Sequence, residues 1–402
     1  MRAAAWALCG LLLAAPAGAG SRELQVGFEE FHYSTDETAL NRGNLLGLDD
    51  HEDLLRGTLG YKEIQGSLRL VFRGFVEKRL GTDADTTWIA REAYGQYSFG
   101  DGFSVRIGKQ RVSWGSGFAW NPTSRLEPPK NPLNPSLEQQ GALAVRTDWI
   151  PTAWAGVILV GAESDAVSRD TPLDAPTPTR RTAAVRARFL VRDTDLAVVF
   201  SGGHGQRTLL GLDLGRTFGS ISAHLEASTY RGAELAPPRD DERFTRVVAG
   251  LLWTRDQTSL SAEYFYNSEG YSQDALDLYL ASLDAAYRHS IDPALPPEIQ
   301  AAERERYIAL ASVPFSGGLG LRRHYLQGAW SRGTASGTWT TALRAVVSLQ
   351  DGGTALTPGL TWAPTGHLTA NLDAIVLIGP EQSEYRLSPL RSALQTRVKV
   401  IW

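Results

Sequence analysis

Apolar and polar residues alternate along most of the chain in segments of about ten residues, each bounded by Gly, Pro, Asp or Asn. Alternation with a period of two predicts β-strands, because successive side chains of a strand point to opposite faces. The clearest segments are Ser67–Val76, Phe103–Val112, Thr182–Val191, Ile221–Tyr230, Thr340–Leu349 and Leu394–Trp402. About eighteen segments of this kind can be placed, which falls within the range of strand numbers found in outer-membrane barrels.

The links between these segments alternate in length. Short links fall at 65–66, 100–102, 151–152, 193–194, 219–220, 256–257, 334–337 and 364–366. Long links fall between them at 34–53, 77–86, 113–140, 163–180, 231–242, 270–320 and 379–390, with tight exceptions at 202–205 and 350–353. Short periplasmic turns and long extracellular loops are typical of transmembrane barrels. With both ends of the barrel on the short-turn side, the number of strands must be even.

The two faces of the segments differ in polarity. Leu68, Leu70 and Phe72 alternate with Arg69 and Arg73, and the segment from 182 to 191 has the same pattern. A soluble β-sandwich would also alternate, but it would leave edge strands to protect. Aromatic residues near the strand ends favour a membrane barrel, since such girdles mark the membrane interfaces; they are Trp88, Trp149, Trp253, Tyr264, Tyr266, Trp330, Trp339 and Trp362, and the chain ends on Trp402. The sequence therefore predicts an all-β protein, a single antiparallel transmembrane β-barrel of about eighteen strands.

The start of the chain has the features of an export signal. Arg2 precedes the apolar stretch Ala3–Ala15 and the small residues of Ala17–Ala19, so we expect a signal peptide over 1–19 and the barrel over 20–402. The only cysteine, Cys9, lies in this segment, which excludes disulfides, thiolate metal sites and a cysteine nucleophile from the mature chain. Acidic and basic residues nearly balance, with a formal net charge of −4, whereas a nucleic-acid binder is expected to be clearly basic.

Two of the long links have distinctive sequences. The first, 271–306, carries helical spacing behind a Ser272 cap through Arg288 and a second possible helix from Pro296 to Arg306. It would form either a lid over the pore mouth or an amphipathic cap on the barrel wall. The second, 113–140, is rich in proline, which restricts its backbone. It would either fold into the barrel as a constriction, with Trp120, Asn121, Arg125 and Lys130 at the pore, or pack outside against the helical link.

The predicted interior face carries many arginines. They are Arg69, Arg73, Arg106, Arg146, Arg186, Arg188, Arg246, Arg344 and Arg397, with Lys399, against Glu29, Glu92, Asp148, Asp213, Glu226, Glu263 and Asp373. Rings of arginine favour anions, because guanidinium is permanently charged and binds carboxylate or phosphate through two hydrogen bonds. Alternatively, these arginines pair with the neighbouring acids across the wall. The segments near 153–161 and 195–201 are apolar on both faces, so a loop or a plug is expected to cover that part of the interior.

Catalytic and metal sites receive little support. Ser222, His224 and Glu226 share one predicted interior face, but residues two apart on a strand are about 7 Å apart, and such a triple arises easily by chance. The other histidines show no metal-ligand spacing. The acidic clusters at 49–53 and 240–242 would either bridge lipopolysaccharide through divalent ions or, as we favour, be solvated loop charge. We therefore predict that the protein is not an enzyme and has no cofactor.

One block of the chain has a family resemblance. Arg91–Tyr94, Arg106–Gln110, Ser113–Gly115 and Trp120–Pro122 together resemble the corresponding block of the alginate export family of porin-like outer-membrane barrels, which includes barrels of Wzy-type exopolysaccharide export systems. The resemblance covers about residues 88–150. It implies an eighteen-stranded outer-membrane pore for a secreted polymer.

The leading hypothesis is an outer-membrane pore that exports a polysaccharide through an arginine-bearing lumen. The alternative is a general or anion-preferring porin for uptake of small hydrophilic solutes, and a third possibility is a structural barrel with a filled lumen. Export predicts a continuous wide lumen and a periplasmic polysaccharide export protein as partner, whereas a porin predicts an ion-conducting pore without one. The other expected partners are lipopolysaccharide, outer-membrane lipid and the barrel assembly machinery.

Overall fold

The computed structural model describes residues 21–80, 86–126, 130–132, 140–164, 180–204, 206–233, 235, 241–316 and 320–402. The expected signal peptide and parts of the proline-rich link lie outside these ranges. Within them, no helix is both long and apolar enough to cross a membrane.

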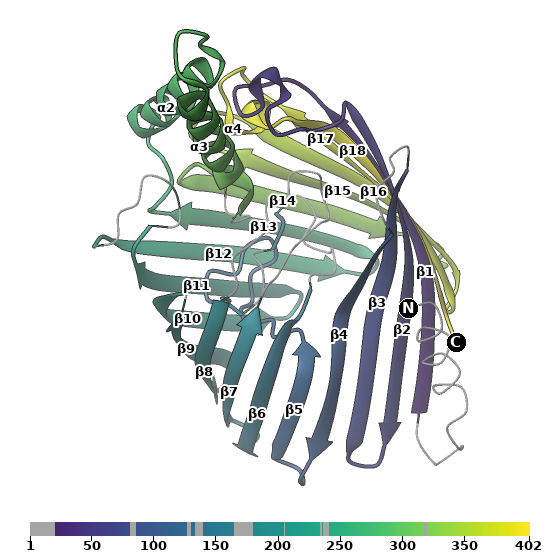
Figure 1. Ribbon diagram of the computed structural model, residues 1–402. Coiled ribbons are helices and arrows are strands. Elements are labelled where there is room, and N and C mark those ends of the chain that lie inside the picture. Colours follow the sequence, from purple (N-terminus) through teal and green to yellow (C-terminus); the bar gives the residue numbers. More distant parts are fainter. Residues whose placement is uncertain are drawn as a thin grey trace.

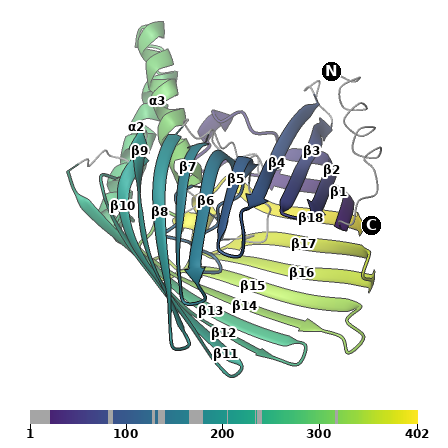
Figure 2. The same cartoon turned by 90° about the horizontal axis from the view of Figure 1, so that it is seen from below.

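Eighteen antiparallel strands form one closed barrel, which confirms the predicted fold and strand number (Figures 1 and 2). Each strand pairs with its neighbours in the sequence, and the ring closes where the first strand pairs with the last. The strands are β1 (Ser21–Thr35), β2 (His51–Gln65), β3 (Leu68–Leu80), β4 (Thr87–Ser98), β5 (Phe103–Gln110), β6 (Ala142–Thr152), β7 (Ala155–Ser164), β8 (Arg180–Val191), β9 (Thr194–His204), β10 (Gln206–Phe218), β11 (Ile221–Arg231), β12 (Arg243–Arg255), β13 (Thr258–Asn267), β14 (His324–Gly333), β15 (Trp339–Ser348), β16 (Thr354–Thr365), β17 (Leu368–Ile378) and β18 (Leu390–Ile401).

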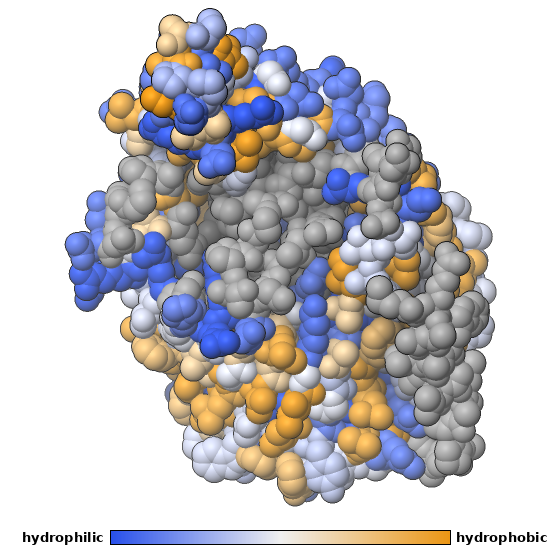
Figure 3. Space-filling view, in the orientation of Figure 1, coloured by the Kyte–Doolittle hydropathy of each residue, from blue (hydrophilic) through white to orange (hydrophobic). Residues whose placement is uncertain are grey.

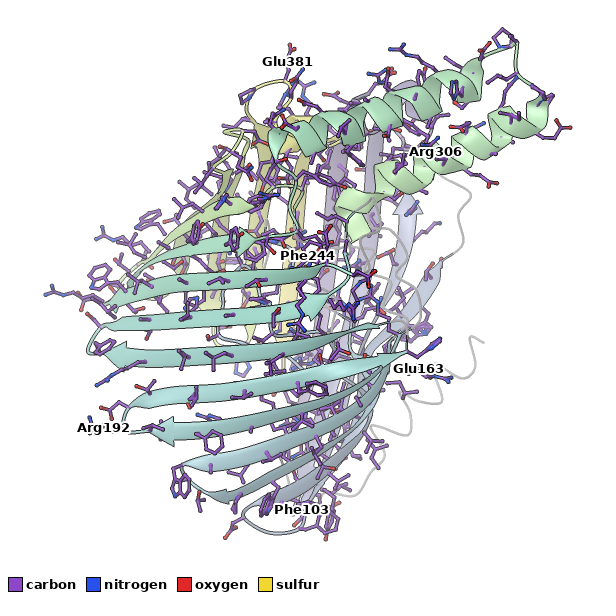
Figure 4. All side chains as sticks on the ribbon, turned by 90° about the vertical axis from the view of Figure 1, so that its left-hand side faces the viewer. Phe103, Glu163, Arg192, Phe244, Arg306 and Glu381 are labelled. Carbon is purple, nitrogen blue, oxygen red and sulfur yellow. The ribbon has the colours of Figure 1, made fainter. Side chains whose placement is uncertain are left out.

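The seam between β1 and β18 runs from Gln25 opposite Ile401 to Thr35 opposite Leu390, and it ends with a pair of hydrogen bonds at the short-turn end of the barrel. The backbone N–H of Leu24 donates to the carbonyl of Trp402 at 3.0 Å, and the N–H of Trp402 donates to the carbonyl of Leu24 at 2.8 Å. Long loops gather at the opposite end, as the link lengths predicted. In Figure 4, Arg192 marks the short-turn rim and Glu163 the long-loop rim. One short turn is displaced from its predicted place, because β6 continues through Pro151 to Thr152 before the chain reverses.

The outer face of the strands is apolar. Side chains such as Leu70, Ile107, Val145, Phe200 and Leu343 are exposed on the isolated barrel, and apolar residues gather over the outer wall in the lower half of Figure 3. The inward neighbours of these residues include buried charged groups, for example Glu92 and Arg246. A soluble protein would have the opposite arrangement, so this distribution fits a barrel surrounded by lipid.

The described parts of the long loops contain four helical segments: η1 (Arg42–Asn44), α2 (Gln273–Ile291), α3 (Pro297–Ser316) and α4 (Glu384–Leu387). Helices α2 and α3 form a hairpin that projects beyond the barrel (Figure 4). The first predicted helix is confirmed, including its Ser272 cap, which accepts a hydrogen bond from the N–H of Ala275. The second runs to Ser316 rather than ending at Arg306, because Tyr307 and Ala311 continue the face that is buried against α2 and the loop at 39–46.

Candidate functional site: the barrel lumen

All nine predicted lumen arginines lie on the inner face of the wall. The strand register shows this directly, since each lies between outward neighbours that are mostly apolar, as Arg69 does between Leu68 and Leu70. Across β3 to β6, Arg69 pairs with Gln96, Gln96 with Arg106, and Arg106 with Arg146. Three of these four adjacent inward positions are therefore arginines, and we call Arg69, Arg106 and Arg146 the arginine row.

Six of the nine arginines pair with wall carboxylates, as the alternative interpretation of the sequence expected. The N···O distances are 3.1 Å for Arg73–Glu92, 2.6 Å for Arg146–Asp148, 3.0 Å for Arg186–Asp213, 2.5 Å for Arg188–Asp195, 3.1 Å for Arg246–Glu269 and 3.2 Å for Arg397–Glu29. Their charge is balanced locally. These six pairs therefore contribute less net field to the lumen than their number suggests.

Two members of the arginine row differ from these pairs. Arg106 donates to the amide oxygen of Gln96 at 3.1 Å and 2.8 Å, and its guanidinium lies 4.7 Å from the centre of the Tyr94 ring. Arg69 makes no ion pair with any residue that the structure describes, and its buried Nε has no hydrogen-bond partner there. Neutral partners leave the positive charge of a guanidinium intact. On the wall of β3 to β6, Arg69 and Arg106 thus have no carboxylate within ion-pairing distance among the described residues, although the charge of Asp148 acts on Arg106 from farther away.

The described first part of the proline-rich loop, residues 111–126, enters the barrel interior (Figure 1). Its backbone donates hydrogen bonds to two inward carboxylates. The N–H of Gly117 bonds Glu226 at 2.6 Å. The N–H groups of the next three residues bond Glu263: Phe118 at 2.5 Å, Ala119 at 3.0 Å and Trp120 at 3.1 Å. Of the two locations considered for this loop, the structure shows the one inside the barrel.

Hydroxyl side chains of the loop reinforce this attachment. Ser116 Oγ donates to Asp213 at 2.6 Å, and Thr123 Oγ1 donates to Glu226 at 2.8 Å. Carboxylates from β10, β11 and β13 therefore hold one short segment of the loop. Hydrogen bonds that involve a charged partner are typically worth more than neutral ones, so the loop is firmly fixed.

Two glycines allow the loop to approach the wall so closely. Gly115 has φ +91°, and a Cβ there would lie 2.5 Å from a carboxylate oxygen of Glu226. A Cβ on Gly117 would lie 2.1 Å from the carbonyl oxygen of Trp120. Neither position has room for a side chain. The segment Trp114–Trp120 can therefore approach the inward carboxylates because it has glycine at the two positions where the backbone leaves no room for a Cβ.

Apolar side chains of the loop pack against both sides of the interior. Trp120 is 2% exposed and packs against both Phe265 and Tyr325, at centroid distances of 4.9 Å and 6.0 Å. On the other side, Trp114 and Leu126 join a buried cluster with inward residues of the strands that are apolar on both faces, among them Ile158, Val160 and Val199. This confirms the expectation that a loop covers those strands.

The four predicted constriction residues have different roles in the structure. Trp120 is an anchor rather than a pore-lining residue, because it is buried in the packing. The Arg125 guanidinium lies 4.8 Å from the centre of the Tyr230 ring, and Lys130 Nζ donates to the carbonyl of Gly117 at 2.5 Å. Asn121 accepts a turn hydrogen bond from the N–H of Ser124 at 3.1 Å. All four belong to the inward loop.

A buried charge cluster near the start of the barrel was not predicted from the sequence. Arg56 is fully buried and contacts Glu77 at 2.6 Å and Glu29 at 3.3 Å, and its guanidinium lies 4.2 Å from the centre of the Phe75 ring. The alternation of faces along the strand could have identified it. Glu77 continues the inward series of Arg69 and Arg73 on β3, and Arg56 stands opposite Glu77 in the register.

The residues that resembled a catalytic triple do not form one. His224 Nε2 lies 3.0 Å from Glu263 and the ring meets Phe118 edge-on, whereas Ser222 Oγ lies 2.9 Å from Thr217. In the described ranges no group of three or more His, Cys, Asp or Glu is arranged to hold a metal ion. His224 serves as a further support for the loop.

The helical hairpin is attached to the first extracellular loop. Arg42 pairs with Asp284, and the N–H of Arg42 donates to the hydroxyl of Tyr307 at 2.6 Å. Leu40 is buried with Leu276 and Leu283. The hairpin projects away from the barrel in Figure 4, so the structure shows neither a lid lying across the lumen nor a cap on the barrel wall; the hairpin packs on the neighbouring long loop instead.

No family model matches the chain, and no curated protein matches it. Among solved structures, the chain is similar to the outer membrane protein OprD of Pseudomonas aeruginosa, with a TM-score of 0.54 and 9% identity over 95% of this chain and 94% of the other. It is also similar to OccK2 (OpdF) of P. aeruginosa, with a TM-score of 0.57 and 11% identity over 95% and 97%. A third similar structure is P. aeruginosa OpdK with vanillate, with a TM-score of 0.55 and 11% identity over 95% and 98%.

These likenesses extend over nearly the whole length of each chain and agree with the closed barrel described above. At such low identity they establish the fold. They do not support the resemblance to the alginate export family.

Proposed function

We propose that this protein is an outer-membrane channel for small hydrophilic solutes and that it prefers anions. The observation that carries the proposal is the arginine row on β3 to β6, where Arg69 and Arg106 face the interior without a carboxylate partner among the described residues. Guanidinium groups on a channel wall attract anions and bind carboxylates without proton transfer. One barrel of the same fold, OpdK, has been solved with vanillate, which is a carboxylate.

The inward loop favours small solutes over a polymer. A polysaccharide export pore needs a continuous wide passage, but here a segment anchored by Asp213, Glu226 and Glu263 occupies part of the interior. A channel for small solutes tolerates such a constriction. Lipopolysaccharide and the barrel assembly machinery remain the partners that we propose for a barrel of this kind.

The test is single-channel recording of the purified barrel in a planar bilayer with a KCl gradient. We expect a steady conductance with a reversal potential that shows chloride preference. Replacing both Arg69 and Arg106 by glutamine should reduce that preference several-fold, whereas Arg255→Gln, a matched change at the outer short-turn rim, should leave it unchanged. A cation-preferring or non-conducting parent barrel would contradict the proposal. Loss of surface polysaccharide after gene deletion, with solute uptake intact, would favour export instead.

A further inference from the structure

A recess of about 160 Å³ lies in the barrel wall formed by β13 to β17. Its inward lining residues are Ser259, Ser261, Ser331, Arg344, Thr357 and Asp373, together with three residues that have little or no side chain, Ala329, Ala342 and Gly359. The arginine row lies on β3 to β6, well away around the eighteen-strand ring. The recess is therefore a separate feature of the lumen.

The recess exists because adjacent strands carry small inward side chains. In the register, Ser259 pairs with Ser331, Ala342 with Gly359, and Gly359 with Asp373. The next inward row contains Ser261, Ala329 and Arg344. Strands lie about 4.8 Å apart, so side chains no larger than serine on four neighbouring strands leave a hollow between the larger residues on either side.

Asp373 lies across the glycine of this row. A Cβ at Gly359 would be 2.5 Å from Asp373 Oδ1, so only glycine lets the carboxylate take this position. Asp373 makes no close hydrogen bond or ion pair among the residues that the structure describes, although the charges of Arg397 and Arg344 act on it from farther away. These charges do not occupy the hydrogen-bonding positions of the carboxylate, and the recess is where a solute would supply donors to them.

The other polar groups of the recess are one cation and several hydroxyls. Arg344 offers only donors, Asp373 offers only acceptors, and each hydroxyl of Ser259, Ser261, Ser331 and Thr357 can act as either. A ligand that matches this set must carry several groups that donate and accept at once. Vicinal hydroxyls do so, and they can present two donors to one carboxylate.

We propose that this recess binds a small polyol of about monosaccharide size. Its volume of about 160 Å³ equals about five waters at ~30 Å³ each, so a solute with five or six hydroxyls replaces the hydrogen bonds of the water it displaces. The inference deepens the proposed function, on which it rests, by adding a neutral solute class to the anions attracted by the arginine row.

The recess lies beyond the inward loop on the path towards the periplasm. Ser261 is two residues from Glu263, which holds the loop, and it lies nearer the short-turn end of β13. A solute entering from the long-loop end therefore meets the loop first and the recess afterwards. A weak site there would hold a polyol briefly before its release.

The test measures interruption of the chloride current by hexitols in single-channel recordings, with the polyol added on the short-turn side. Two variants remove the site in different ways: Asp373→Asn removes the carboxylate charge, and Ala342→Leu fills the recess without changing any charge. Asp195→Asn is the matched control, because it makes the same change at a lumen acid of β9 that pairs with Arg188.

We expect the hexitol to cause resolved current blocks in the parent barrel. Their mean duration should fall at least tenfold in Asp373→Asn and Ala342→Leu but stay within twofold in Asp195→Asn. Equal blocking in all four proteins would overturn the proposal, as would blocking by glycine or acetate but not by the hexitol. If the barrel carries no current, the proposed function fails by itself. The recess is then tested by calorimetric titration of detergent-solubilised barrel with the hexitol, where loss of binding in Asp373→Asn supports it and no binding by the parent overturns it.

Discussion

The indole of Trp120 stacks on the ring of Phe265, with centroids 4.9 Å apart and planes inclined by 15°. This contact joins the inward loop to β13, next to the position where Glu263 binds the loop backbone. An apolar anchor and a charged anchor thus act on the same residue of the loop.

Replacing Trp120 by alanine should release part of the loop. Truncating a buried aromatic side chain typically costs about 3–5 kcal/mol, and here the loss falls on the segment that lies in the lumen. We expect a higher and noisier single-channel conductance. The matched control is Trp154→Ala, since Trp154 is exposed in a short turn. An unchanged conductance in the Trp120 variant would show that the loop does not limit the current.

Adding a single methyl group at Gly117 should have a similar effect through the backbone. The new Cβ would meet the Trp120 carbonyl at 2.1 Å, so the turn must open and weaken the hydrogen bonds to Glu226 and Glu263. Gly117→Ala should therefore raise conductance and increase protease cleavage within the loop. Gly215→Ala serves as the comparison, because its Cβ would have no atom within 4 Å. Identical behaviour of the two variants would argue against a tight loop attachment.

The buried cluster around Arg56 should matter for barrel stability. Arg56→Met leaves the carboxylates of Glu29 and Glu77 buried with less compensation, and breaking a buried pair typically costs about 3–5 kcal/mol. Lys62→Met on the same strand removes a half-exposed pair with an N···O distance of 3.7 Å to Glu23, and such a pair contributes at most about 1 kcal/mol. Urea unfolding of both variants in detergent measures the difference. Equal losses would show that Arg56 is not a stabilising centre.

The loop contacts around Glu384 should weaken as pH rises. Desolvation raises the pKa of Glu384 to about 7, in a network where its carboxylate accepts hydrogen bonds from Tyr325 and the N–H of Leu321, with Asp351 and Arg322 nearby. Because the packed state binds this proton more tightly than a solvated state does, packing is fully favoured below the ordinary pKa of 4.5. Between pH 4.5 and about pH 7 the equilibrium constant for packing falls, by at most tenfold per pH unit. Above about pH 7 it no longer changes with pH.

Hydrogen exchange at the amide of Leu321, corrected for its intrinsic pH dependence, measures this opening. We expect more opening at pH 8 than at pH 5 in the parent barrel. Glu384→Gln should show the same opening at both values, whereas Glu381→Gln, a change at an exposed neighbour in the same loop, should behave like the parent. A pH effect that survives in Glu384→Gln would assign it to another group.

The alternating pattern contains enough information to predict the barrel and the inward arginines. Period two fixes the face of every residue in a regular strand, which is why the inward face of Arg186 and Arg188 follows from their own segment; their place on a solute path stays a prediction. Arg56 was missed because β2 is less regular, with adjacent leucines at 54 and 55 and glycines at 57 and 60. The wall residues that bind the loop could not be predicted. Gly117 and Glu226 are 109 residues apart in the sequence, and the sequence around either residue contains no sign of their contact.

Because Asp213, Glu226 and Glu263 are engaged by the proline-rich loop, that loop both narrows the passage and shields negative charge from it. If the loop moved away from the wall, the passage would become wider, and the exposed carboxylates would attract cations into it. The size cutoff and the ion selectivity of this barrel are therefore properties of one segment. A substitution that weakens the attachment of the loop must therefore alter the size cutoff and the ion selectivity together. Evolution cannot change one of these two properties through this loop without changing the other.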